Sequence, residues 1–148
     1  GVPPVPADTL YNNAQRDRLG GKLDLAMQEF QQYLQYYAQT DLAPNAQYYI
    51  AEIHFSKGEL ENALQEFDLV LEKYPDNSKT PDALYMKGQT LVKLGRRTQG
   101  GQEFQELIKR FPTHDLSKKA CTQLQAMGLR CSAAARTAPS RSTSKRKK

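Results

Sequence analysis

Residues 44–75 read PNAQYYIAEIHFSKGELENALQEFDLVLEKYP, and this stretch contains a tripeptide, QEF, that occurs three times in the chain. The copies begin at Gln28, Gln65 and Gln102, so each lies 37 residues after the previous one. The same interval separates further aligned residues: Tyr11, Tyr48 and Tyr85; Ala14, Ala51 and Gly88; Gly21, Gly58 and Gly95; Ala26, Ala63 and Gly100; Leu34, Leu71 and Ile108; and Tyr37, Tyr74 and Phe111. A fixed period of roughly 20–50 residues is the signature of a repeat array, so the chain is predicted to be a solenoid of three units.

Each unit divides at its central glycine into two stretches with helical spacing. In the second unit, Ala46, Ile50 and Ile53 fall near one stripe of a first helix, and Gly58 supplies the left-handed turn residue that ends it. After this turn, the spacing i, i+3, i+4, i+7 predicts a second, amphipathic helix. Its apolar residues are Leu60, Ala63, Leu64, Phe67, Val70 and Leu71.

Prolines mark the borders between units. Pro75 disfavours helical geometry at Tyr74 and cannot donate a helix hydrogen bond, so the second helix should end there. Thr80 is predicted to cap the next first helix, with Pro81 at the first helical position. The repeat therefore consists of a helix, a tight turn, a helix and a loop.

Small residues recur where the two helices of a unit must approach each other. The alanines and glycines at positions 14, 51 and 88 and at positions 26, 63 and 100 leave room for Phe30, Phe67 and Phe104. The Gln and Glu of QEF are expected to face solvent beside this buried ring. Gly100 and Gly101 lie inside the second helix of the third unit. Because each interior glycine costs about 1 kcal/mol relative to alanine, this helix is predicted to be the least stable.

Beyond the third unit, Leu116, Ala120, Leu124 and Met127 have helical spacing and predict a seventh helix, which would cover the apolar face of the last unit. The predicted fold is an all-α superhelix of three helix-turn-helix repeats of 37 residues with a C-terminal capping helix. The predicted boundaries are a Pro-rich linker at 1–7, a repeat domain at 8–130 with repeats at about 7–43, 44–80 and 81–114 and the capping helix at about 115–129, and a disordered basic tail at 131–148.

The formal charge of +5 comes from the C-terminal tail. Residues 133–148 hold six basic residues and no acidic one, and subtracting these six charges leaves −1 for residues 1–132. The tail has too few large apolar residues to pack, so we expect it to be disordered and solvated. A weak, salt-sensitive attraction to polyanions or to an anionic membrane surface is the alternative.

Two cysteines, Cys121 and Cys131, match no metal-binding spacing. On one unbroken helix they would lie about 15 Å apart, which is too far for a disulfide. A bridge becomes possible only if the chain turns back at Gly128, and two free or partly buried thiols are the expected outcome. No apolar run is long enough to span a membrane, and the opening GVPPVP lacks the basic start and apolar segment of a signal peptide.

With the units aligned, the pattern resembles the tetratricopeptide repeat, which has Ala or Gly at position eight, Gly at fifteen, Ala at twenty, an aromatic residue at twenty-four and Pro at thirty-two. The period of 37 exceeds the usual 34 or so, which implies longer loops between units. This spacing, with residues 42–95 and the stretch FQELIKRFP at 104–112, is similar to the C-terminal domain of the Tol-Pal system protein YbgF family, also called the cell division coordinator CpoB.

This resemblance implies a periplasmic protein of Gram-negative bacteria that binds TolA and links outer-membrane constriction to peptidoglycan synthesis during cell division. A peptidoglycan synthase is a further expected partner. Members of the family usually carry an N-terminal coiled coil that trimerises. The sequence shows no such coiled coil, so self-trimerisation is not expected of this chain.

The inner face of a curved array of hairpins is lined by the first helix of each unit, and such a face suits an extended segment or a helix of a partner. Tyrosine offers a large, stiff contact area with a polar end, which is common in binding hot spots. The alternative is that the repeated tyrosines pack between adjacent first helices. The predicted partner-binding residues on this face are Tyr11, Gln15, Arg18, Tyr48, Glu52, Phe55, Tyr85, Gln89 and Val92.

Catalysis is not expected, and neither a cofactor nor a metal ion is predicted. His54 and His114 are the only histidines, and neither belongs to a nucleophile–base pattern or lies near a phosphate-binding glycine loop. His54 lies on an otherwise apolar helix face, where a structural role is favoured. The predicted partner is a protein, and nucleic acid is not expected.

Two other functions remain open. One is a scaffold lipoprotein of outer-membrane protein assembly. That family usually has five repeats and an acylated N-terminal cysteine, whereas this sequence shows three repeats and no such cysteine. The other is a polyanion or surface binder that acts through residues 133–148. Its binding would fall steeply with salt and would be lost on deletion of the tail.

Overall fold

The computed structural model describes residues 5–132. Within this range the chain forms seven α-helices and no β-strand. The predictions made for residues 1–4 of the linker and for residues 133–148 of the tail lie outside the described residues. The helices are α1 (Ala7–Leu19), α2 (Leu23–Tyr37), α3 (Ala43–Ser56), α4 (Leu60–Lys73), α5 (Thr80–Lys93), α6 (Arg97–Arg110) and α7 (Asp115–Ala126).

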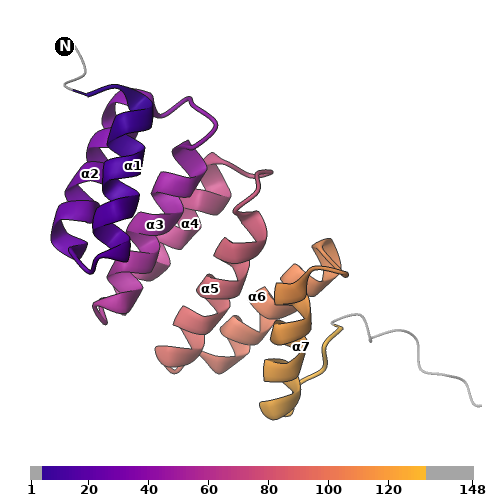
Figure 1. Ribbon diagram of the computed structural model, residues 1–148. Helices are drawn as coiled ribbons and strands as arrows, with labels where there is room; N and C mark the ends of the chain where they lie inside the picture. Colours follow the sequence, from indigo (N-terminus) through magenta and orange to yellow (C-terminus); the bar gives the residue numbers. More distant parts are fainter. Residues whose placement is uncertain (1–4, 133–148) are drawn as a thin grey trace, which may run out of the picture.

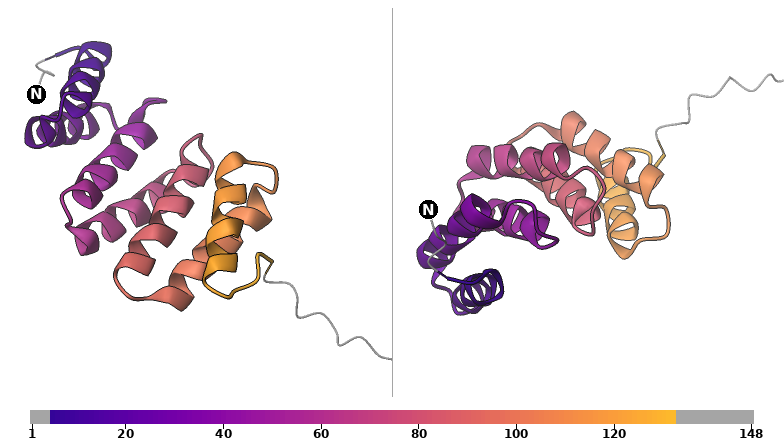
Figure 2. Two further views of the ribbon diagram at one scale, coloured as in Figure 1. Left: turned by 60° about the horizontal axis from the view of Figure 1, so that its bottom comes forward. Right: turned by 90° about the horizontal axis from the view of Figure 1, so that it is seen from above.

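The helices pack as three hairpins, α1 with α2, α3 with α4 and α5 with α6, and α7 packs against both α5 and α6 (Figure 1). Successive hairpins lie side by side in a curved row (Figure 2). Because α5 contacts both α3 and α7, the first helices follow one another along the inner side of this curve. The predicted fold, a tetratricopeptide-repeat superhelix of three hairpins and a capping helix, is confirmed.

Glycine residues end the first helix of each repeat, as predicted. Gly21, Gly58 and Gly95 have φ angles of 81°, 79° and 85°, in the left-handed region that glycine adopts at least cost. In the second repeat, the amide of Glu59 donates to the carbonyl of His54 at 2.9 Å. This bond closes the helix end in the manner of a Schellman motif.

The start of α5 differs from the prediction in one detail. Thr80 is not the N-cap but the first helical residue, with Lys79 before it. The loop residue Asn77 organises this turn. Its side-chain oxygen accepts from the backbone amide of Lys79 at 2.6 Å, and its backbone amide donates to the hydroxyl of Thr80 at 3.1 Å. Thr80 is fully buried, so its hydroxyl serves the loop rather than the helix end.

A phenylalanine fills the centre of each repeat. Phe30, Phe67 and Phe104 are fully buried, and each belongs to a separate apolar cluster. The small residues at the aligned positions are buried as well: Ala14, Ala26, Ala51, Ala63, Gly88 and Gly100. Burying one Phe side chain contributes about 1.5–3 kcal/mol, so the three rings anchor the three hairpins.

Gly88 and Gly100 let α5 and α6 approach more closely than alanine would. A Cβ atom on Gly100 would lie 2.8 Å from the carbonyl oxygen of Gly88, and a Cβ atom on Gly88 would lie 2.5 Å from the ring of Phe104. Real Cβ atoms do not come so close to other atoms. The prediction from the sequence included only the cost of Gly100 to the stability of α6. The same glycine also permits the close packing of α5 and α6.

The glutamates of QEF do not all face solvent, contrary to the prediction, and two of them bind the first helix of their own repeat. Glu66 accepts a hydrogen bond from the side-chain amide of Gln47, and Glu103 pairs with Lys87 at 3.2 Å. One carboxyl oxygen of Glu29 is buried. The prediction failed because the partners differ from repeat to repeat and leave no periodic signal.

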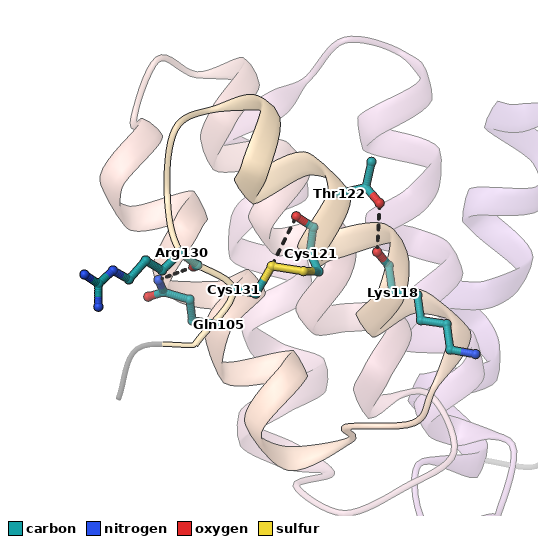
Figure 3. The surroundings of a disulfide bond; sticks show 6 residues. All are labelled: Gln105, Lys118, Cys121, Thr122, Arg130 and Cys131. Carbon is teal, nitrogen blue, oxygen red and sulfur yellow. Dashed lines mark hydrogen bonds between the residues drawn. A yellow bond between two sulfur atoms is a disulfide. The ribbon is translucent and has the colours of Figure 1, made fainter. Parts of the chain in front are cut away.

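The chain turns back after α7 at Gly128, whose φ is 78°. The turn brings Cys131 to Cys121, and the two form a disulfide with their Cα atoms 4.9 Å apart (Figure 3). The expectation of free thiols is therefore wrong. The alternative, a bridge made possible by a turn at Gly128, is correct.

The capping helix α7 keeps the register of the repeats. Ala46, Ala83 and Ala120 lie 37 residues apart, and all three are fully buried. The helix thus takes the place of the first helix of a fourth unit. Within the described residues no second helix follows it.

Residues 127–131, called the C-terminal strap from here on, run back over α6 instead. Leu129 packs against Gly101. The side chain of Gln105 donates to the carbonyl of Arg130 at 2.8 Å (Figure 3). The strap therefore packs on α6 at the C-terminal end of the array.

Candidate functional site

The nine residues predicted to bind a partner lie on α1, α3 and α5, in three columns that run across the repeats. The tyrosine column is the most buried, with Tyr11 8% exposed, Tyr48 5% exposed and Tyr85 half-buried. The other two columns are half-buried: Gln15, Glu52 and Gln89, and Arg18, Phe55 and Val92. The accessible part of this face therefore consists mainly of amide, charged and apolar side chains rather than of tyrosine rings.

Each repeated tyrosine packs its ring against the phenylalanine of its own QEF. The ring centroids of Tyr11, Tyr48 and Tyr85 lie 5.9, 5.7 and 5.7 Å from this phenylalanine. Such aromatic pairs add about 0.5–1.5 kcal/mol beyond their burial. The tyrosine rings thus join the first helix to the second helix of one repeat. The hydroxyls of Tyr11 and Tyr85 also contact the adjacent first helix, as the packing alternative expected, through Asn45 on α3 and Gln123 on α7.

A chain of hydrogen bonds links α1 to α3 along the inner face. Arg18 donates to the side-chain oxygen of Gln15 at 2.8 Å and to the carboxylate of Glu52 at 3.2 Å. The hydroxyl of Tyr11 accepts from Gln15 at 3.3 Å and from Asn45 at 3.4 Å. Four of the predicted residues therefore meet at the junction of the first two repeats.

Tyr49 belongs to this junction, although the sequence pattern did not identify it. The guanidinium carbon of Arg18 lies 4.1 Å from the ring centroid of Tyr49, and the ammonium of Lys79 lies 5.0 Å from the same centroid. A cation near an aromatic ring is attracted by about 0.5–2 kcal/mol. The period could not reveal Tyr49, because Asn12 and Met86 occupy the aligned positions. A survey of every residue on the inner helix face could have found it.

At the other end of the face, contacts tie α5 to its neighbours. The ammonium of Lys93 lies 5.9 Å from the ring centroid of Phe55. The side chain of Gln123 on α7 donates to the hydroxyl of Tyr85 at 2.5 Å. Val92 packs against the apolar cluster of the third repeat. Tyr85 and Val92 therefore take part in the packing of the fold. Phe55 is half-buried and is the predicted aromatic residue that lies outside the tyrosine column.

The hydroxyls of the tyrosine column remain protonated at neutral pH. Burial raises the pKa of Tyr48 above its ordinary value, and the charges of Glu52 and Asp82 raise it further. Burial also raises the pKa of Tyr11 and of Tyr85, opposed in part by one side-chain hydrogen bond at each hydroxyl. These groups can therefore take part in hydrogen bonds but offer no phenolate base.

The two histidines have structural contacts. The ring of His54 lies 2.8 Å from the carboxylate of Glu59, and His114 accepts the amide of Leu116 at 3.0 Å at the start of α7. Residues 5–132 contain no group of three or more His, Cys, Asp or Glu side chains that could hold a metal ion. In the same range, no helix has the length and apolar character needed to cross a bilayer.

Comparison with known families identifies this array. The family model YfiO, described as an outer membrane lipoprotein, matches residues 3–131. The chain belongs to the YfiO family. The match includes all seven helices of the YfiO-family chain, the disulfide and the strap. A search of curated proteins found no match.

Solved structures share the fold of this YfiO-family chain. A tetratricopeptide repeat protein from Parabacteroides merdae is 21% identical with a TM-score of 0.69, and the match covers 84% of this chain but only 46% of that one. The chain thus spans about half the length of that relative. For the TPR domain of Arabidopsis OM64, the identity is 12%, the TM-score 0.69 and the coverage 82% of this chain and 95% of that one.

A third structure is the type III secretion translocator chaperone SycD from Yersinia enterocolitica. It is 18% identical with a TM-score of 0.70, over 82% of this chain and 91% of that one. At these identities the three likenesses show the fold alone, which is a tetratricopeptide-repeat array. Arrays of this type present surfaces for other proteins.

Proposed function

We propose that the chain is a non-enzymatic protein-binding module of the bacterial cell envelope, and that the inner face of α1, α3 and α5 holds the partner. The observation that carries this proposal is the junction of the first two repeats, where Arg18, Glu52 and Tyr49 meet on a half-buried surface. Their mutual contacts order the side chains before a partner arrives, which lowers the entropic cost of binding.

The proposed location is the periplasm, and two observations support it. The YfiO family is described as outer membrane lipoprotein. Cys121 and Cys131 form a disulfide, and disulfides persist in oxidising compartments such as the periplasm but are rare in the cytosol.

The first proposed partner is TolA, on the ground of the sequence resemblance to the YbgF/CpoB family. In that role the module would link outer-membrane constriction to peptidoglycan synthesis, with a peptidoglycan synthase as a further partner. The YfiO match favours a second function, that of a scaffold lipoprotein in outer-membrane protein assembly. Both functions use the inner face as a protein-binding surface.

The test is an NMR titration of the full chain with the periplasmic part of TolA. The variants Arg18→Gln and Phe55→Ser alter half-buried side chains and leave the buried tyrosines in place. Each is expected to weaken binding by about tenfold or more, with the dispersed spectrum of the folded chain preserved. Gln65→Ala, an exposed change on α4, is the matched control and should bind like the wild type.

The outcomes separate the proposals. A wild-type chain that does not bind TolA would contradict that partner, and the same titration with an unfolded outer-membrane β-barrel protein would then test the second function. Binding that both inner-face variants retain would contradict the inner face as the site. Binding that disappears on deletion of residues 133–148, with a steep salt dependence, would favour the polyanion alternative.

A further inference from the structure

Asp17 on α1 and Glu29 on α2 are neighbouring acidic side chains of the first hairpin, and each has one buried carboxyl oxygen. Asp17 is only 3% exposed, and its Oδ2 atom is buried without a hydrogen-bond partner among the fixed donors of the fold. The Oε1 atom of Glu29 is buried and lacks such a partner as well. The two carboxyl groups are neighbours, since each shifts the pKa of the other.

Two ionised carboxylates in this position would repel each other, and Oδ2 of Asp17 and Oε1 of Glu29 would each lack a donor. A single proton removes both problems, because a carboxylic acid can donate to a carboxylate and form a strong, charge-assisted hydrogen bond. Burial and the neighbouring Asp17 raise the pKa of Glu29 to about 7, while the hydrogen bond from Glu29 lowers the pKa of Asp17. The pair therefore holds one proton in weakly acidic solution.

The other two repeats satisfy the aligned glutamate with a permanent donor. Glu66 receives the side-chain amide of Gln47, and Glu103 receives the ammonium of Lys87 at 3.2 Å. The position of Asp17 is held by a histidine in the second repeat and by a leucine in the third. Only the first repeat therefore depends on a proton from solvent for this contact between its two helices.

The charged groups around the pair do not supply a substitute for the proton. Arg16 contacts the other carboxyl oxygen of Asp17 at 3.4 Å from a side chain that is 68% exposed, and Lys22 acts on Asp17 only through its charge. From α3, the apolar residues packed on this hairpin are Ala43, Ala46, Tyr49, Ile50 and Ile53. The charged Lys57 at the end of α3 also reaches the hairpin, where it is bound to Asp24 at 2.5 Å. The nearest acid of α3 on the inner face, Glu52, is bound to Arg18.

We propose that the Asp17–Glu29 pair is a pH-sensitive contact of the first repeat: with one shared proton it holds α1 against α2, and loss of this proton loosens this hairpin but not the other two. The contact adjoins the candidate binding face, since Arg18 follows Asp17 in the chain and reaches Glu52. The inference concerns the stability of the hairpin and does not depend on the identity of the partner.

The direction of the pH effect on stability depends on whether the folded or the unfolded chain keeps the proton to higher pH. The folded chain holds a proton on Glu29 up to about pH 7, whereas an unfolded glutamate releases it near its ordinary pKa of 4.5. The contribution of Glu29 is therefore complete below its ordinary pKa, declines as the pH rises from there, and is lost above about 7. The free energy of opening α1 should fall across this window.

The experiment is amide hydrogen exchange of the full chain, followed by NMR, at about pH 5.5 and about pH 8 and corrected for intrinsic exchange. Protection of α1 amides in the wild type should be lower at the higher pH by about 30-fold, because about 1.5 units of this pH change lie below the raised pKa of about 7. In Glu29→Gln, which has its own amide donor, the protection should be independent of pH. The matched variants Glu66→Gln and Glu103→Gln should keep the wild-type pH response of α1.

Two results would overturn the proposal: wild-type protection of α1 that does not change with pH, or a pH response that survives in Glu29→Gln. Asp17→Asn is a second variant that removes the same proton requirement. A direct carboxyl-carbon NMR titration of the wild type needs no substitution. A titration of Glu29 near its ordinary pKa of 4.5 would contradict the pair, and one near 7 would support it.

Discussion

Leu129 lies directly against Gly101, so that a Cβ atom on Gly101 would come within 2.9 Å of a methyl carbon of Leu129. The two residues belong to the C-terminal strap and to α6, and the disulfide between Cys121 and Cys131 keeps them together. The amide of Leu129 also donates to the carbonyl of Leu124 at 2.8 Å. A covalent bond, a hydrogen bond and an apolar contact thus close this end of the helical array.

Replacement of Cys131 by Ser should destabilise the chain. The disulfide joins residues ten apart in sequence, and a closed loop of this size contributes about 2–3 kcal/mol through the lost entropy of the unfolded chain. Urea unfolding of the oxidised wild type and of Cys131→Ser measures the difference in the free energy of unfolding. Equal midpoints would show that the strap does not depend on its disulfide.

Reduction provides the control for this prediction. A strong dithiol reductant should lower the unfolding midpoint of the wild type toward that of Cys131→Ser. The double variant Cys121→Ser/Cys131→Ser has no bond to reduce, so its midpoint should not change. A similar decrease in the double variant would mean that the reductant acts elsewhere.

Gly100→Ala should destabilise the chain, although alanine is the better helix former by about 1 kcal/mol. The added methyl would lie 2.7 Å from a methyl of Val92 and 2.8 Å from the carbonyl oxygen of Gly88. Because a backbone atom cannot move aside at low cost, we expect a loss of about 1–3 kcal/mol, measured by thermal unfolding.

Gly101→Ala is the matched control on the same helix. Its nearest contact is the flexible end of Leu129, which can shift. The gain in helix propensity and the cost of this shift should nearly cancel. A variant Gly100→Ala that is as stable as Gly101→Ala would contradict the close approach of α5 and α6.

The fold could be predicted because its determinants repeat. The aligned Phe30, Phe67 and Phe104, together with the small residues around them, occur at one interval and specify the same hairpin each time. The glycine turns follow the same logic, since a left-handed residue is needed at one place in each unit. The periodic residues therefore predict the packing within each repeat.

Contacts between unlike residues could not be predicted in this way. The partners of the QEF glutamates are Asp17, Gln47 and Lys87 in the three repeats, at positions that do not align. Tyr49 is absent from the period for the same reason. The disulfide depends on the direction of the chain after Gly128, and spacing alone leaves that direction open.

Tyr74→Phe should lower stability by about 0.5–1.5 kcal/mol, the usual net value of one hydrogen bond. The hydroxyl of Tyr74 donates to the carbonyl of Ala38 at 3.2 Å and so joins the loops that follow the first and second repeats. Tyr36→Phe is the control, because the hydroxyl of Tyr36 makes no hydrogen bond within residues 5–132. Equal unfolding midpoints for the two variants would assign no stabilising role to the bond between the loops.

Lys87→Met should destabilise the chain more than the loss of an exposed ion pair does. The ammonium of Lys87 lies 2.9 Å from Asp68 and 3.2 Å from Glu103, so one side chain joins α4, α5 and α6. Burial alone would lower the pKa of Lys87, but the hydrogen bond to Asp68 and the charge of Glu103 outweigh it and raise the pKa. The ion pairs of Lys87 therefore stabilise the fold fully below the ordinary pKa of lysine. Their contribution is lost only as the pH rises past the raised pKa.

The methionine keeps the apolar stem of Lys87 and leaves the two carboxylates without their cation, for which we expect a loss of about 1–2 kcal/mol near pH 7. Unfolding in urea measures this loss, and Arg96→Gln at the exposed pair with Glu61 is the control that should change stability little. The double variant Lys87→Met/Glu103→Gln should recover part of the loss, because the neutral amide replaces the more buried of the two carboxylates that Lys87→Met leaves without a cation. Strictly additive effects of the two changes would mean that Lys87 and Glu103 do not interact, and that Lys87 stabilises the array through its stem alone.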